Sequence, residues 1–169
     1  LGQALDYVEG GGPKLEPVTD AAGIARLSAG RLHEVLGPVY ETVRRVRAGL
    51  PAGAALIGFA GSPWTVATYM VEGGGSRDFL RVKSWAYRDP EGFQALIDLL
   101  IEATTAYLGI QIAAGADVVQ LFDSWAGVLP EAGFARWVIE PTRRITSALR
   151  ARFPEVPVIG FPRGARLLY

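Results

Sequence analysis

The sequence contains no cysteine and a single histidine. Without cysteine, the chain can form no disulfide, thiolate metal site or cysteine nucleophile, and its composition fits a reducing compartment, so we expect a cytoplasmic protein. The histidine, His33, falls at the start of an expected helix, away from any strand end, and is interpreted as a surface residue. A histidine-based triad or metal site therefore cannot be built from this chain, and no metal is expected.

The chain also lacks an excess of charge and an uninterrupted apolar span. Lys plus Arg and Asp plus Glu number 17 each, so the formal net charge is zero, and nothing attracts the chain to nucleic acid or to an anionic membrane. The most apolar windows, around residues 56–71 and 103–119, are interrupted by polar residues, and no secretory signal opens the chain. We therefore expect a soluble protein without nucleic-acid or membrane partners.

Hydrophobic residues make up 50% of the 169 residues, which is enough for the core of one domain but not of two. The chain begins at Leu1 rather than at Met, and it ends at Tyr169 directly after a strand-like run. Both ends are therefore interpreted as cut, and residues 1–169 are expected to form a single incomplete domain.

Short apolar runs bounded by turn residues predict three buried strands, at residues 56–60, 117–122 and 156–161. Helical periodicity and capping residues predict helices at residues 33–48, 63–72, 77–87, 90–114 and 130–152. Pro141 predicts a kink or a break in the last of these.

The first fifty residues carry weaker signals. Residues 1–20 are expected to be mostly loop with residues 4–8 extended, and Asp20 or Thr19 should cap a short helix that follows. The helix at 33–48 is amphipathic, and five of its apolar residues are expected to face inward: Val35, Leu36, Val39, Val43 and Val46.

The alternation of helices with buried strands predicts an α/β fold with a parallel sheet. Each predicted strand ends in a loop that contains polar residues or glycine, which is typical of a (β/α)₈ barrel and also of an open doubly wound sheet. Because a barrel normally needs about 250 residues, the chain would form roughly half of one.

Four side chains near the predicted strand ends are candidates for a site. Tyr69 is either a core tyrosine or a hydroxyl donor above the strands, and Ser124 is either a turn residue or a ligand contact. Asp123 is interpreted as a cap or as a carboxylate held by a backbone amide. Arg163 could pair with a carboxylate or remain in solvent. Gly73–Gly75 before Arg77 could form an anion-binding helix start, but neither nucleotide-binding glycine motif is present.

Longer strings carry a family resemblance. GFAGSPWTVATYMVEGGGS at residues 58–76 is similar to the signature segment of the uroporphyrinogen decarboxylases. Three further strings agree in order and spacing: LDYVEGGGP near the start, AGADVVQLFDSWAG at residues 114–127, and PVIGF near the end. The resemblance covers the whole chain, but only the middle of the family's length.

This resemblance implies a (β/α)₈ TIM barrel, usually a homodimer, with a cleft at the carboxyl ends of the strands. The implied reaction removes the carboxylates of four acetate side chains of uroporphyrinogen, to give coproporphyrinogen, with no metal or organic cofactor. The pyrrole itself must then accept a proton, so the protein contributes electrostatics, orienting hydrogen bonds and arginines for the remaining carboxylates.

The resemblance also assigns residues. Tyr69 and Ser124 correspond to substrate-contacting residues of the family, and Phe122 corresponds to an aromatic residue that lines the cleft. The family's catalytic aspartate and its arginine motif lie upstream of Leu1, and its site histidine lies beyond Tyr169. No catalytic residue is therefore expected within this chain, and the isolated chain is expected to be inactive.

Two alternatives stay open. Methyltransferases of the same barrel superfamily act on corrinoid or thiol substrates and bind zinc through residues beyond this chain's end, but the intact PWT and YMVEGGGS block favours a decarboxylase. The chain could also be a non-catalytic fragment, in which two open sheet edges would favour pairing or aggregation.

Overall fold

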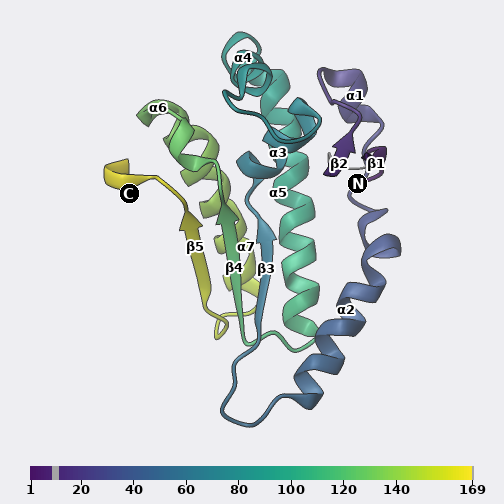
Figure 1. The fold of residues 1–169 in the computed structure, drawn as a ribbon. Coiled ribbons are helices and arrows are strands. Elements are labelled where there is room, and N and C mark those ends of the chain that lie inside the picture. Colours follow the sequence, from purple (N-terminus) through teal and green to yellow (C-terminus); the bar gives the residue numbers. More distant parts are fainter. Residues whose placement is uncertain (9–11, 169) are drawn as a thin grey trace.

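A computed structural model describes residues 1–8 and 12–168. Its centre is a parallel sheet formed by β3 (Ile57–Gly61), β4 (Val118–Asp123) and β5 (Val158–Pro162), with β4 in the middle. Figure 1 shows the three strands side by side, pointing the same way. All three predicted strands are confirmed to within two residues at each end, and so is the α/β class.

Helices cover one face of this sheet. They are α3 (Pro63–Glu72), α4 (Leu80–Arg88), α5 (Pro90–Ala113) and α7 (Glu140–Arg152), and α5 contacts each of the other three. The buried Phe93 ring makes edge-on contacts with three tryptophans, Trp64, Trp85 and Trp137. Because these tryptophans come from three different helical segments, Phe93 joins the layer together.

The other face of the sheet is open. Side chains alternate along a strand, so Val119 and Leu121 point into the helical layer while their neighbours point the opposite way. We call the opposite side the open face; its apolar residues are Ile57, Phe59, Phe122, Ile159 and Phe161. Phe59 and Phe161 are 58% and 50% exposed, and Phe122 touches both rings, with centroids 5.7 and 5.9 Å away. Parallel sheets are normally covered on both faces, so this face fits further elements of the same fold.

Helix ends follow the predicted signals closely. Asp89 precedes α5 and accepts a hydrogen bond from the Gly92 amide (2.9 Å), and Asp20 does the same for Gly23 at the start of α1 (Ala21–Ala25). Gly73, with φ of 81°, ends α3 in the left-handed conformation that glycine adopts most easily. The next helix, α4, begins three residues later than predicted, after Phe79.

The predicted helix at 130–152 is divided, as Pro141 indicated. It consists of α6 (Glu131–Phe134), a π-helical turn η2 (Ala135–Ile139) and then α7, after a short 3₁₀ turn η1 (Ala126–Val128). Because Pro141 has no amide hydrogen, it cannot donate the usual helical hydrogen bond to the carbonyl of Trp137, four residues earlier. The break therefore lies in the turn that precedes the proline, where the helix widens.

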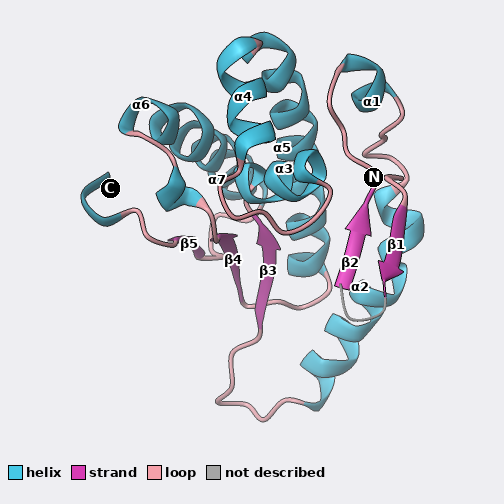
Figure 2. Ribbon diagram, turned by 45° about the horizontal axis from the view of Figure 1, so that its top comes forward, coloured by secondary structure: helices cyan, strands magenta, loops and turns pink. Residues whose placement is uncertain are grey.

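The prediction for the N-terminal residues was wrong in part. Residues 5–8 are extended as expected, but β1 (Leu5–Val8) pairs in antiparallel fashion with β2 (Gly12–Leu15), which the sequence did not predict (Figure 2). Residues 9–11, within the LDYVEGGGP string, lie outside the described residues. The structure ends with a 3₁₀ turn, η3 (Arg166–Leu168).

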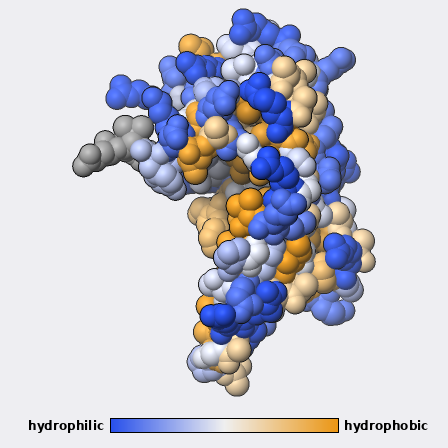
Figure 3. Space-filling view, turned by 90° about the vertical axis from the view of Figure 1, so that its right-hand side faces the viewer, coloured by the Kyte–Doolittle hydropathy of each residue, from blue (hydrophilic) through white to orange (hydrophobic). Residues whose placement is uncertain are grey.

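The prediction for the inward face of α2 (Leu32–Gly49) was also wrong in part, since Leu36, Val39 and Val43 are only partly buried. Val35 and Val46 are exposed, and only Tyr40 is buried, against Tyr107 of α5. The helix lies along one side of the molecule (Figure 1), and hydrophobic residues reach the surface there among hydrophilic ones (Figure 3). His33 is exposed, as predicted, with Nδ1 3.0 Å from the Tyr40 hydroxyl.

Within the described residues, α5 is long and apolar enough, by length and composition, to cross a membrane. The sequence interpretation named an apolar window at residues 103–119, which overlaps the second half of this helix, but judged it too interrupted to cross a membrane. Half of its most apolar stretch is buried inside the protein, where it packs on the sheet and on neighbouring helices. These contacts are those of a core helix.

A buried amide side chain connects α5 to the edge of β3. Gln111 donates from Nε2 to the Phe59 carbonyl and accepts at Oε1 from the Phe59 amide, both at 3.0 Å. The backbone groups of Leu56 and Ser62 form hydrogen bonds with β4 and its flanking residues. Because the direction of the backbone groups alternates along a strand, the amide and carbonyl of Phe59 point to the opposite edge of β3. Gly58 leaves the necessary space, because a Cβ there would lie 2.9 Å from Oε1 of Gln111.

We predict that Gln111→Leu lowers the free energy of unfolding by about 1–3 kcal/mol, because the Phe59 amide and carbonyl lose their partner. Urea unfolding measures the cost, and hydrogen exchange at the Phe59 amide should accelerate. Gln94→Leu on the same helix is the matched control, since Gln94 bonds only to exposed Asp98. Equal effects of the two substitutions would contradict this role for Gln111.

Candidate functional site

The segments that follow the three parallel strands are joined at one edge of the sheet. The Ser62 amide donates to the Phe122 carbonyl (2.8 Å), and the Arg163 amide donates to the Asp123 carbonyl (2.9 Å). The Gly127 amide in turn donates to the Arg163 carbonyl (3.2 Å). We call this edge the strand-end site, and its geometry is fixed by backbone hydrogen bonds before any side chain is considered.

The start of α3 positions the loop after β4. Pro63 occupies the first helical position, and the next two side chains both reach Trp125. Trp64 donates from Nε1 to the Trp125 carbonyl (3.1 Å), and the Trp125 amide donates to Oγ1 of Thr65 (3.2 Å). The backbone of Trp125 is therefore held on both sides by the Pro-Trp-Thr segment.

Thr65 also connects this loop to a buried acid. Its hydroxyl donates to Oδ1 of Asp123 (2.6 Å), a residue only 2% exposed, whose Oδ2 has no partner among the described residues. Burial raises the pKa of Asp123 to about 7, against the lowering effect of the Thr65 hydrogen bond. Asp123 was expected to be a cap or to be held by a backbone amide. The structure adds a side-chain hydroxyl, that of Thr65, and the Trp125 backbone amide also acts to lower the pKa of Asp123.

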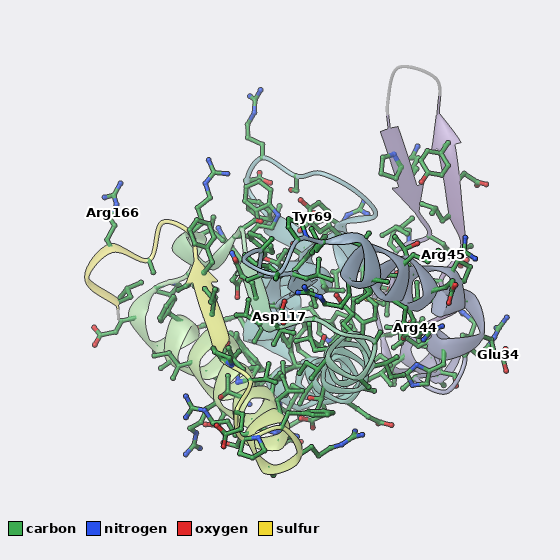
Figure 4. The ribbon with its side chains drawn as sticks, turned by 90° about the horizontal axis from the view of Figure 1, so that it is seen from below. Glu34, Arg44, Arg45, Tyr69, Asp117 and Arg166 are labelled. Carbon is green, nitrogen blue, oxygen red and sulfur yellow. The ribbon has the colours of Figure 1, made fainter. Side chains whose placement is uncertain are left out.

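Tyr69 lies one helical turn beyond Thr65 and is 37% exposed. Its ring meets the Trp125 ring edge-on, with centroids 6.3 Å apart, and Trp125 also packs on Phe79 (4.9 Å). The Tyr69 hydroxyl makes no hydrogen bond with the described residues, so it is available to a ligand. Figure 4 shows its position relative to the strands.

The other two predicted site residues lie nearby. Phe122 belongs to the open face, between Phe59 and Phe161. Ser124 directly follows β4, is partly buried and lines a pocket of about 770 Å³ together with Trp125. The structure thus brings Tyr69, Phe122 and Ser124 to one edge of the sheet, while their roles toward a substrate stay predictions.

Sequence reasoning missed Thr65 and Trp125, which connect the predicted residues. Two signals were present: a threonine inside the otherwise apolar start of α3, and a tryptophan directly after Ser124. Neither signal identifies a partner by itself, because Thr65 and Asp123 are 58 positions apart in the sequence.

The glycine triplet forms no anion site in this structure. At the start of α4, the Val82 amide donates to Oε1 of Glu72 (3.0 Å), and the Phe79 amide donates to Oγ of Ser76 (3.0 Å). The protein's own carboxylate therefore takes the place that an external anion would use. In the described part of the chain, no group of three or more acidic or histidine side chains could hold a metal ion.

A sequence profile of the family described as "Uroporphyrinogen decarboxylase (URO-D)" matches residues 1–169. The chain belongs to this family. A uroporphyrinogen decarboxylase from Rhodospirillum rubrum is 57% identical over 169 residues, which is all of this chain and 49% of that protein. One from Paracoccus denitrificans is 54% identical over 166 residues, 98% of this chain and 48% of that protein. The chain thus spans about half the length of the curated relatives it matches.

Among solved structures, a methyltransferase from Methanosarcina mazei is similar, with a TM-score of 0.64 and 20% identity over 94% of this chain and 46% of that one. At this identity the likeness shows the fold alone. Family membership and this likeness confirm the predicted fold, part of a (β/α)₈ barrel with parallel strands. The methyltransferase alternative gains no support beyond the fold, whereas the relatives at high identity are decarboxylases.

We predict that Asp123 makes stability depend on pH. Folded Asp123 keeps its proton up to about pH 7, whereas an unfolded aspartate releases it near 3.8. The folded state is therefore favoured at low pH, and this contribution is lost as the pH rises through that window, by at most about 4 kcal/mol. Unfolding free energies measured across this range should fall more steeply than in Asp123→Asn.

Asp98→Asn provides the matched control, since Asp98 is a surface acid paired with Arg144. Its pH profile should follow that of the unmodified chain. Parallel profiles for Asp123→Asn and the unmodified chain would contradict a raised pKa at Asp123.

Proposed function

We propose that residues 1–169 form the central part of a uroporphyrinogen decarboxylase barrel. The complete protein would convert uroporphyrinogen III to coproporphyrinogen III by removing four acetate carboxylates, in haem and tetrapyrrole biosynthesis. One observation carries the proposal. The Pro-Trp-Thr, Tyr-Met-Val-Glu and Phe-Asp-Ser-Trp segments, separated in sequence, meet at the strand-end site through Thr65, Trp125 and Tyr69.

The proposed contribution of this chain is to bind and orient the macrocycle. At the carboxyl ends of the strands, the open face offers the aromatic edges of Phe122 and Phe161, an apolar surface that suits a tetrapyrrole ring. The hydroxyl groups of Tyr69 and Ser124 would donate hydrogen bonds to substrate carboxylates beside it. Phe122 would line the cleft between these groups.

The acid chemistry is proposed to come from outside this chain. Loss of carbon dioxide without an electron sink requires a protonated pyrrole and an anion facing it. Asp123 does not suit that task, because its carboxyl is buried behind Thr65 on the helix-covered side of the sheet. No residue of this chain is therefore proposed as catalytic, and no cofactor or metal is required.

Further expectations belong to the same proposal. We propose a cytoplasmic protein, homodimeric in its full-length form, that takes a small-molecule substrate and has no nucleic-acid or membrane partner. The balanced charge supports the last point, since 17 basic and 17 acidic residues leave no net attraction to polyanions.

The function is tested by a barrel chimera, in which residues 1–169 replace the matching segment of the Rhodospirillum rubrum relative. We expect the barrel chimera to convert uroporphyrinogen III to coproporphyrinogen III, measured by chromatography of the oxidised products. The isolated chain should show no turnover. A folded but inactive barrel chimera would contradict the proposed function, and turnover by the isolated chain would show that catalytic groups lie within it.

In the barrel chimera, Tyr69→Phe should lower kcat/KM about tenfold to a hundredfold, the cost of one hydrogen bond to a charged group. The thermal midpoint should stay unchanged, because the Tyr69 hydroxyl has no partner in the described protein. Tyr87→Phe, on the exposed surface of α4, serves as the control. An unaltered rate in Tyr69→Phe would remove this hydroxyl from the site.

A further inference from the structure

The pocket beside Ser124 is positively charged. We call it the Arg163 pocket; it is lined by Ser124, Trp125, Gly127, Val128, Arg163, Gly164, Ala165, Arg166 and Leu168. It measures about 770 Å³ and opens where β4 and β5 end. Among the described residues, its lining includes two arginines and no acidic residue, so none of these side chains would repel an anion inside it.

The backbone at Arg163 is rigidly placed. Its amide and carbonyl are both bonded to the segment after β4, through Asp123 and Gly127. Gly127 packs directly on Gly164, because a Cβ at Gly127 would lie 2.6 Å from the Gly164 carbonyl oxygen. Gly164 has a φ of 74°, which lets the chain turn immediately after Arg163. Arg163 therefore leaves the sheet at a fixed point next to Ser124.

The guanidinium groups of Arg163 and Arg166 have no acidic partner in residues 1–8 and 12–168. Other arginines of the described chain are of both kinds: Arg47 pairs with Asp117 and Arg144 with Asp98, whereas exposed Arg150 has no acidic partner there. Figure 4 shows Arg166 extending away from the body of the protein. The two positive charges at the pocket favour an anion there.

We propose that the Arg163 pocket binds carboxylate side chains of the substrate. The guanidinium fork matches a carboxylate with two parallel hydrogen bonds, and the Ser124 hydroxyl, which makes no bond within the described protein, offers a further donor. Arg163, which leaves the sheet beside Ser124, holds the carboxylate, and Arg166 adds positive charge at the outer rim. The identification of the ligand as a tetrapyrrole carboxylate rests on the proposed function. The affinity of the pocket for alkyl carboxylates does not depend on that function.

The experiment uses the barrel chimera and two readouts. Binding of uroporphyrin III, an oxidised eight-carboxylate analogue, is followed by fluorescence, and steady-state kinetics are measured with uroporphyrinogen III. Arg163→Gln should weaken uroporphyrin binding and raise KM about fivefold to thirtyfold, with a smaller change in kcat. Arg163→Lys should recover part of the affinity. The loss of affinity caused by Arg163→Gln should be smaller at high salt, because salt screens the charge of the arginine.

Arg150→Gln is the matched control, since Arg150 is an exposed arginine of α7 outside the pocket. It should alter neither readout. Unchanged uroporphyrin affinity and KM in a folded Arg163→Gln variant would overturn the proposed subsite while leaving the proposed function intact. If the parent chimera binds uroporphyrin through Arg163 but yields no coproporphyrinogen, the subsite stands and the proposed function fails.

Discussion

The hydrogen bond between Thr65 and Asp123 is the contact on which the strand-end site depends. A carboxyl group buried at the end of β4 requires a partner, and the Thr65 hydroxyl supplies a short side-chain hydrogen bond to it. The same threonine accepts the Trp125 amide, so one side chain sets the distance between α3 and the loop after β4. The placement of Tyr69 against Trp125 follows from this arrangement.

The site also lies where the covered and the open faces of the sheet meet. On the covered side, Phe93 and its three tryptophan neighbours fix the helix α3, which carries Trp64 and Thr65. On the open side, Phe122 and its aromatic neighbours present an apolar surface next to Ser124. Rigid packing on one side thus supports exposed groups on the other, which is the arrangement that an oriented ligand needs.

Local signals were sufficient for much of the fold, since buried strands and capped helices depend on neighbouring residues. Periodicity places the valines of α2 on one face but does not show whether another element covers that face. Val35 was therefore predicted to face inward, although it is exposed. The glycine-rich sequence around β2 lacks the alternation of apolar and polar residues that indicates a strand, so the hairpin was not predicted. Tyr69, Ser124 and Phe122 came from the family resemblance. The Thr65–Asp123 and Gln111–Phe59 contacts join residues more than fifty positions apart, and no local pattern reports such pairs.

The Gln111 amide has a consequence for how this sheet avoids unwanted partners. An edge strand offers unpaired backbone groups to any extended chain that approaches it, which leads to aggregation. At the middle of the β3 edge, both backbone groups of Phe59 are already occupied by Gln111. A foreign strand must first displace a buried side chain that spans only one residue of the ladder. A closed barrel leaves no free sheet edge, so in the complete fold a neighbouring strand takes this position; the amide guards the β3 edge against intermolecular β-pairing only until then.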